Sequence, residues 1–465
     1  MKNNPNLSYD NKSVSSIVRH ARKLLGKSLR DLYPECNQKN AGKGSLGQLV
    51  EKIHFGYDPN SRSEADFKEA GLELKCTPLK VLSDGSMVSK ERLVLNIIDY
   101  EKELDKTFET SSLMEKNALL LLMFYLHEKG INNLDLLFKI IRTWSIPEED
   151  RKIFMDDWKI IHDKIITGHA HEISEGDTLY LAACPKGSRA HANQRKQPMS
   201  DILADQRAYS IKSSYINAII IDSFYDKEAC NGLKISKRIK EKLQSAVPSL
   251  RQYAGEETFE QHLINKFARY YGQTISQIAD ECQFELSRSP KSMAYKFCRG
   301  VLGVTSSHIA EFEKAGVMLK TIRLEANGGL KEAMSFTQIN FCELAKEKTW
   351  EESEWHNILT HRFFFVIFRK SESGNDAQAI LERVMFWAMP VGDLDKSEEY
   401  WRDTRDKVRR GDYTHFIKST EHPISHVRPK AKNSDDKMLT PQGTMEKKKC
   451  YWLNRKYVLD KIVNA

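Results

Sequence analysis

DFKEAGLELK, residues 66–75, recurs later in the chain as EFEKAGVMLK, residues 311–320. In the first copy the residues from Leu72 to Thr77 alternate between apolar and polar, which predicts a strand with one buried face. Internal self-similarity of this kind is the signature of a repeated structural unit. The two stretches therefore predict that the same strand is built twice.

Four further segments of the chain recur in the same order, and each later copy is numbered 242 to 245 higher than the earlier one. Chance matches would not keep one offset through five segments, so we predict two copies of one fold of roughly 200 residues. The matched pairs are 107–109 with 349–351, 158–168 with 401–411, 185–186 with 429–430, and 211–215 with 453–457.

The periodicity around the repeated strand predicts a mixed α/β fold. Apolar residues that recur every three or four positions favour helices, whereas alternating or continuous apolar runs favour strands. We expect two tandem domains, each a mixed sheet flanked by helices: a catalytic domain at 1–225, a basic linker at 226–256 and a degenerate second domain at 257–465. The expected helices are 14–29, 46–53 and 156–167, and the expected strands are 72–77, 93–98 and 118–126.

The composition narrows the class of protein without deciding it. The 465 residues carry 72 basic and 64 acidic side chains, a net charge of +8, which permits a polyanionic partner. The eight cysteines form no CxxC pair, so we expect neither a zinc site nor a disulfide framework. Free thiols are typical of a reducing compartment, so we expect the protein in the cytoplasm. No apolar run reaches the roughly 18 residues that a membrane helix needs.

The repeated strand carries a candidate catalytic set in its first copy. Residues i and i+2 of a strand point the same way, so Glu73 and Lys75 share one face while Leu72 and Leu74 face the core. A carboxylate there can hold a divalent cation, and the ammonium can steer and acidify an attacking water. Asp66 lies just before the strand and can supply a second ligand. Glu51, on the preceding helix, could orient the lysine or join the metal shell.

Glu and Lys also occur on exposed strands simply as an ion pair, so the pattern has a structural interpretation as well. The second copy favours the catalytic one, because it has Glu311 in place of Asp66 and Met318 in place of Glu73. A thioether does not replace a carboxylate on a hard cation. We therefore expect the second copy to keep the scaffold without the chemistry.

The first copy resembles the active-site block of the MutH family of PD-(D/E)XK nucleases. Its residues 42–51 read GKGSLGQLVE, followed by Asp66-Phe67 and by GLELKCTP at 71–78. The resemblance implies Mg²⁺-dependent DNA cleavage, with Asp66 and Glu73 as metal ligands. It implies a catalytic set that consists of Lys43, Glu51, Asp66, Glu73 and Lys75.

Two MutH-like halves, the second degenerate, resemble the two-domain type II restriction endonucleases that cut at GATC. That resemblance implies duplex DNA containing GATC as substrate, with cleavage before the G of each strand. It implies a second half that binds another GATC site and promotes dimerisation or DNA looping, so a homodimer on DNA is expected. A cognate DNA methyltransferase is the expected companion.

The base-contacting positions depart from the family pattern. Cys184 replaces the arginine of an Arg-Pro-Lys motif that the second copy keeps at 428–430, and a family tyrosine falls at Ser210 and at Trp452. Arg and Lys can donate two hydrogen bonds to guanine, although the same side chains often contact only phosphate or solvent. The candidate DNA-binding residues are Lys186, Arg189, Arg195, Lys212, Arg428, Lys430 and Trp452.

Two other functions fit parts of the sequence. A methyl-directed nickase of mismatch repair would share the catalytic block, but the duplication argues against it. A DNA-binding regulator that does not cut would share the fold, but the intact set of Glu51, Asp66, Glu73 and Lys75 argues against it.

Overall fold

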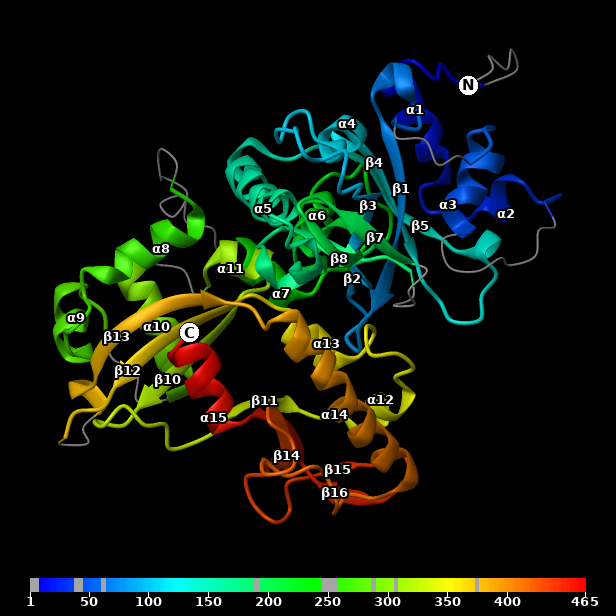
Figure 1. Ribbon diagram of the computed structural model, residues 1–465. Coiled ribbons are helices and arrows are strands. Elements are labelled where there is room, and N and C mark those ends of the chain that lie inside the picture. The colour runs from blue at the N-terminus through cyan, green and yellow to red at the C-terminus, as the bar shows by residue number, and fades with distance from the viewer. Residues whose placement is uncertain are drawn as a thin grey trace. The chain divides into compact units, whose positions relative to one another are not determined.

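The computed structural model describes residues 8–36, 45–59, 64–187, 193–244, 257–285, 290–304, 308–372 and 376–465. The chain divides into two compact units (Figure 1). Unit 1 comprises Met1–Ile173, Thr178–Val247 and Ser306–Gly316, and unit 2 comprises Ser174–Asp177, Pro248–Thr305 and Val317–Ala465.

The main sheet of unit 1 has the order β2-β1-β4-β5. β1 (Glu73–Val81) runs parallel to β4 (Leu120–Leu126) and antiparallel to β2 (Met87–Ser89), and β4 pairs antiparallel with β5 (Phe138–Trp144). Every residue of β4 except Tyr125 is buried, as its continuous apolar run predicts. A core of Ile17, Leu24, Val50, Phe67 and other apolar residues packs on one face of this sheet.

A second sheet of unit 1, β3-β9-β6, is antiparallel throughout, and a two-stranded ribbon, β7-β8, accompanies it. Figure 1 shows the main sheet between α1 to α3 on one side and α5 and α6 on the other. These strands are β3 (Leu93–Ile97), β6 (Leu181–Pro185), β7 (Gln194–Gln197), β8 (Ser200–Asp205) and β9 (Arg207–Ile211). The helices are α1 (Val14–Ala21), α2 (Leu29–Leu32), α3 (Ser45–Leu49), α4 (Ser112–Asn117), α5 (Glu148–Ile166), α6 (Ser213–Phe224), α7 (Lys237–Gln244) and α11 (Ala310–Ala315).

Unit 2 repeats this topology, except that its described strands include no counterpart of the edge strand β2. Its sheet β10-β12-β13 has the parallel and then antiparallel pairing of β1-β4-β5, and its sheet β11-β17-β14 has the antiparallel pairing of β3-β9-β6. The strands are β10 (Met318–Leu324), β11 (Met334–Gln338), β12 (Phe363–Arg369), β13 (Ile380–Trp387), β14 (Ser425–Pro429), β15 (Lys437–Leu439), β16 (Met445–Lys447) and β17 (Lys449–Leu453). The helices are α8 (Phe259–Ala268), α9 (Ile275–Glu281), α10 (Pro290–Leu302), α12 (Phe341–Lys346), α13 (Glu354–Leu359), α14 (Val391–Arg410) and α15 (Arg455–Val458).

Matching side-chain contacts confirm that the two units are copies of one fold. The hydroxyl of Tyr215 donates to Asp150 Oδ2 over 2.7 Å in unit 1, and that of Tyr457 donates to Asp393 Oδ2 over 2.9 Å in unit 2. The strand register agrees as well, since Leu120 pairs with Trp144 as Phe363 pairs with Trp387. The predicted fold class, two tandem α/β domains that each contain a mixed sheet flanked by helices, is confirmed.

Some predicted element bounds were wrong. The helix expected over 14–29 ends at Ala21 and continues as a 3-10 turn only to Leu24, because the chain then turns at Gly26, whose φ is +76°. The helix expected over 156–167 begins earlier, at Glu148, directly after Pro147. The predicted linker contains α7, and this helix belongs to unit 1. The limits of the two domains stay a prediction.

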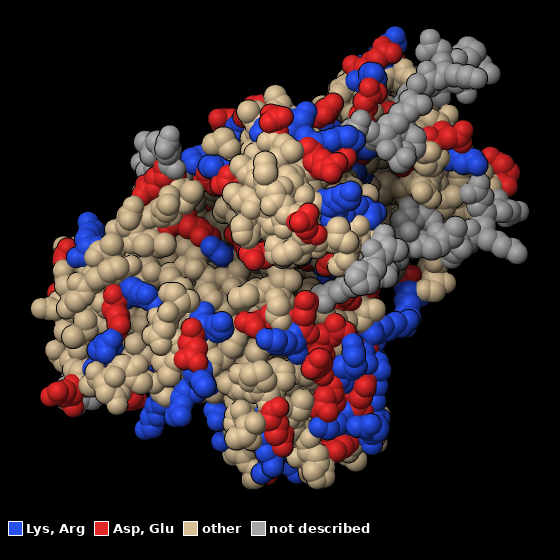
Figure 2. All heavy atoms as spheres, viewed as in Figure 1, with Lys and Arg blue, Asp and Glu red and all other residues tan. Residues whose placement is uncertain are grey.

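Charge is distributed evenly over the visible surface. Figure 2 shows Lys and Arg interspersed with Asp and Glu over this face, so the excess of eight positive charges forms no single basic stripe there. Among the described residues, no helix is long and apolar enough to cross a membrane.

Candidate active site

A tight hairpin brings Asp66 back to the start of β1. The backbone N–H groups of Phe67 and Leu72 each donate to the other residue's carbonyl, over 3.0 and 3.3 Å. Gly71 closes the turn with φ +60°, a left-handed conformation that favours glycine. Phe67 and Leu72 are fully buried, which anchors both ends of the turn in the core. Local sequence and core burial together therefore hold Asp66 beside the strand.

The two carboxylates at this turn are fixed by backbone donors. The N–H of Asp66 donates to Glu73 Oε2 over 3.0 Å, and the N–H of Leu74 donates to Asp66 Oδ2 over 3.1 Å. Glu73 is only 2% exposed. Two carboxylates held side by side, one buried and one half-buried, create local negative charge that a cation would relieve.

Two ammonium groups approach the buried carboxylate of Glu73. Lys75 Nζ lies 2.8 Å from Glu73 Oε1 and also donates to the carbonyl oxygen of Leu95, on β3, over 2.9 Å. Lys116 Nζ, from α4, lies 3.6 Å from the same Oε1. Lys116 was missed in the sequence, because it is distant along the chain and belongs to no motif that marks it.

Glu51 belongs to the same electrostatic cluster. It lies in a π-helical turn, Val50–His54, that continues α3. Burial, and then the charges of Asp66 and Glu73, raise the pKa of Glu51 to about 7. Burial and the neighbouring Glu73 likewise raise the pKa of Asp66 to about 6. The buried hydroxyl of Tyr57 is a further neighbour of Asp66 and Glu51, which the sequence pattern did not reveal.

The donor set fits a hard divalent cation rather than a preformed metal cage. Within the described ranges, no three His, Cys, Asp or Glu side chains are arranged so that they could hold a metal ion. Mg²⁺, however, is usually bound through one or two carboxylates and several waters. Asp66 and Glu73 could supply such a pair of oxygen ligands, and both are already oriented by backbone hydrogen bonds.

The equivalent place in unit 2 keeps the lysine and loses the carboxylate. Met318 starts β10 as Glu73 starts β1, and Lys320 donates to the carbonyl of Ser335, on β11, over 3.0 Å. Burial and the nearby Lys430 lower the pKa of Lys320 to about 8. The position that corresponds to Lys116 is Ile358, since α4 and α13 begin at equivalent serine caps.

The structure gives the predicted DNA-binding residues different surroundings, and their roles stay predictions. Lys186, Arg195 and Arg428 are exposed. Lys212 donates to the carbonyl of Thr178, so contact with DNA would require it to leave this partner. Lys430 donates to Ser335 Oγ over 2.8 Å, and the guanidinium of Arg428 lies 3.7 Å from the ring centre of Trp452. Lys43 and Arg189 lie outside the described residues.

Comparison with known proteins agrees with this geometry. The family model "DNA mismatch repair enzyme MutH" matches residues 55–157, which include Asp66, Glu73 and Lys75. The type II restriction enzyme Sau3AI of Staphylococcus aureus is 33% identical over 95% of this chain and 92% of its own length. The chain belongs to the MutH-related type II restriction endonucleases.

This restriction endonuclease matches the mismatch-repair proteins over only one of its two halves. The MutH proteins of Serratia proteamaculans and Escherichia coli are each 26% identical over 45% of this chain, and each match covers 92% of the relative. Membership of the family makes the chain a site-specific deoxyribonuclease, as its catalytic block predicts.

Proposed function

We propose that this restriction endonuclease hydrolyses duplex DNA at GATC, before the G of each strand, and uses Mg²⁺ held by Asp66 and Glu73. The observation that carries the proposal is the hydrogen-bonded set of Asp66, Glu73 and Lys75 at the start of β1. The target sequence is supported by the similarity to Sau3AI over nearly the whole chain and by the resemblance of both halves to GATC-cutting enzymes.

When bound, the divalent cation supplies Lewis-acid chemistry and acidifies water. The chain's own residues then divide the remaining work. Lys75, held by the Leu95 carbonyl, positions the water whose oxygen bonds to phosphorus while the P–O bond before the G breaks. Lys116 offers a second positive charge to the developing phosphorane. Glu51, with its pKa near neutrality, orients Lys75 or joins the metal shell. Lys43 is proposed as a further basic member of the catalytic set.

We further propose that the catalytic domain spans 1–225 and that 257–465, joined by the basic segment 226–256, is an effector domain. Lys186, Arg189, Arg195 and Lys212 are the proposed DNA contacts of the first half. Arg428, Lys430 and Trp452 are those of the second. Binding of a second GATC site by the effector domain would favour a homodimer on DNA. A cognate methyltransferase would protect the host DNA.

A digest tests this function directly. Unmethylated plasmid of known sequence is incubated with the protein and Mg²⁺, and the ends are sequenced. Four-base 5′ overhangs that read GATC are the expected result. A single nick at those sites would favour the repair nickase instead. Intact plasmid together with sequence-specific gel retardation would make the protein a regulator that binds without cutting.

A further inference from the structure

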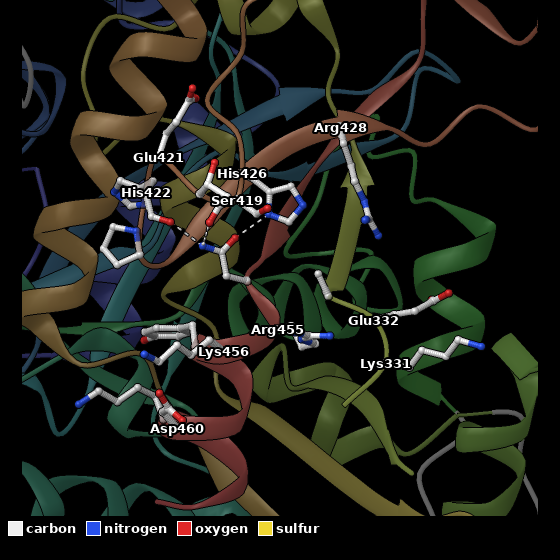
Figure 3. Close-up of a pocket in the computed structure, with 16 residues that line it drawn as sticks. Lys331, Glu332, Ser419, Glu421, His422, His426, Arg428, Arg455, Lys456 and Asp460 are labelled. Carbon is white, nitrogen blue, oxygen red and sulfur yellow. Dashed lines mark hydrogen bonds between the residues drawn. The ribbon is translucent and has the colours of Figure 1, made fainter. Parts of the chain in front are cut away.

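A pocket of about 860 Å³ lies in unit 2, and neither Met318 nor Lys320 lines it (Figure 3). Strand β14, helix α15 and its π-helical continuation (Leu459–Val463), and the loop residues 419–423 and 331–333 form its walls. The proposed catalytic chemistry does not use it.

Five cations and three carboxylates line this pocket. No ion pair to any of the five cations is present among the described residues, so their charge is not already neutralised by a salt bridge. Figure 3 shows the carboxylate of Glu421 pointing away from Arg428 and Arg455. The cations are Lys331, Arg428, Arg455, Lys456 and Lys461, and the carboxylates are Glu332, Glu421 and Asp460.

A buried histidine forms part of the wall. Asn454 Nδ2 donates to the carbonyls of His422 and Ser419, so its Oδ1 must accept from His426 Nδ1, which lies 2.6 Å away. His426 is 5% exposed, and its other ring nitrogen forms no hydrogen bond to any described residue. The ring stacks on Trp452 at 6.2 Å between centres. His426 is therefore held in the wall from two sides, and one of its ring nitrogens has no partner among the described residues.

Unit 1 lacks this charge at the equivalent positions. Leu181 pairs with Ile211 as Ser425 pairs with Leu453, which fixes the correspondence of the strands. Unit 1 then has Ala182, Cys184, Ser213 and Ser214 where unit 2 has His426, Arg428, Arg455 and Lys456. The fold itself does not require the cations, so they point to a ligand of unit 2.

We propose that this pocket of unit 2 binds phosphate groups through Arg455, Lys456 and Arg428, with His426 in its wall. Arginine and lysine form charge-assisted hydrogen bonds to phosphate oxygens, and cations without a salt bridge around one hollow concentrate such anions. The carrier is either a free polyphosphate or the backbone of a DNA strand. The inference does not depend on recognition of GATC, because phosphate carries no sequence information.

The test uses the full-length protein and the double variant Arg455→Ser/Lys456→Ser, which introduces the residues that unit 1 has at these places. Arg402→Ser/Arg410→Ser, on α14, removes the same charge outside the pocket and serves as the matched control. Sodium tripolyphosphate without metal and a 20-base-pair duplex without GATC are the two probes, titrated by calorimetry. Thermal unfolding midpoints check that all three proteins are folded.

We expect the pocket variant to lose roughly tenfold or more in affinity for one probe, from two lost charge-assisted hydrogen bonds, while the control keeps it. Loss for tripolyphosphate identifies a free phosphoanion as the ligand. Loss of affinity for the duplex alone identifies the DNA backbone as the ligand. In that case the slope of log affinity against log salt concentration should become shallower by about 0.9 for each lost phosphate contact. If the pocket variant binds both probes like the wild type, or if the control loses as much, the proposal is overturned. Cleavage at GATC is assayed separately, so failure of the proposed function would be seen independently.

Discussion

The starts of β1 and β10 are the same piece of fold with different chemistry. Both strands run parallel to a buried neighbour, and in both a lysine two residues into the strand donates to a carbonyl of the second sheet. At β1 the lysine lies beside Glu73, with Lys116 on the other side of that carboxylate. At β10 the corresponding residues are Met318 and Ile358.

This difference teaches that the scaffold does not need its charged residues. Unit 2 keeps the order and register of three main-sheet strands and the Tyr–Asp pair without the carboxylate. Burying a carboxylate costs free energy unless it is paired, which supports our proposal that Glu73 and its two lysines serve function rather than folding.

Glu73→Met gives unit 1 the residue of unit 2. It removes a proposed metal ligand, and unit 2 has the same fold with methionine at this place, so we expect the cleavage rate to fall by roughly 10³-fold or more while duplex binding persists. Plasmid cleavage and gel retardation measure the two effects. The reverse change, Met318→Glu, is the control and should neither rescue Glu73→Met nor create a second active site. A Glu73→Met protein that cuts normally would remove Glu73 from the catalytic set.

Lys116→Ile makes the corresponding exchange on α4. Loss of the ammonium 3.6 Å from Glu73 removes a charge that orients this carboxylate, and we expect turnover to fall about 10- to 100-fold. Single-turnover cleavage separates this effect from DNA binding. Lys102→Ile, an exposed lysine paired with Asp99, should cut at the wild-type rate. Equal rates for both variants would mean that Lys116 has only a structural role.

Lys186→Ala and Lys430→Ala probe the Arg-Pro-Lys positions of the two units. Each should cost roughly tenfold in DNA affinity if the lysine contacts a base. The first should impair cleavage of plasmids with one GATC site, whereas the second should impair only the added rate seen with two sites. Kinetics on one-site and two-site plasmids measure this. Identical behaviour of the two variants would contradict an effector role for unit 2.

The binding of Mg²⁺ or Mn²⁺ should depend on pH. The pKa of Asp66 is raised to about 6 and that of Glu51 to about 7, so both carboxyl groups hold protons below those values. A cation must displace these protons in order to bind. Its affinity for the protein should therefore fall, as the pH drops from 8 to 5, by up to about tenfold per pH unit for each proton displaced. Calorimetric titration of the metal-free protein tests this. A constant affinity over that range would show that these groups do not bind the cation.

Lys320→Met should stabilise unit 2 slightly. The folded pKa of Lys320, about 8, lies below its ordinary value. The folded state therefore disfavours the charged lysine, and this lowers the free energy of unfolding. The loss is complete below pH 8 and disappears once the pH exceeds the unfolded pKa of about 10.4. We expect the free energy of unfolding to rise by about 1 kcal/mol at pH 7 and not at pH 11. Denaturant unfolding at both pH values measures it, and destabilisation at pH 7 would contradict the prediction.

Reasoning from the sequence alone predicted the duplication, the strand and the shared face of Glu73 and Lys75. A constant offset through five segments reports a repeated fold whatever its shape, and the structure confirms it in the strand order of both units. The period of two along a strand placed Glu73 and Lys75 on one face, and they lie 2.8 Å apart. These inferences succeeded because they depend on neighbours in the sequence.

The groups from distant parts of the chain that contact Glu73 and Lys75 became known from the tertiary structure. The carbonyl of Leu95 and the ammonium of Lys116 reach Lys75 and Glu73 through strand pairing and helix packing, which local pattern does not encode. The cations of unit 2 are scattered from Lys331 to Lys461 and become one pocket only when β14 and α15 meet. Charge acts through space rather than along the chain, so the electrostatics of a site are fixed by the fold that assembles it.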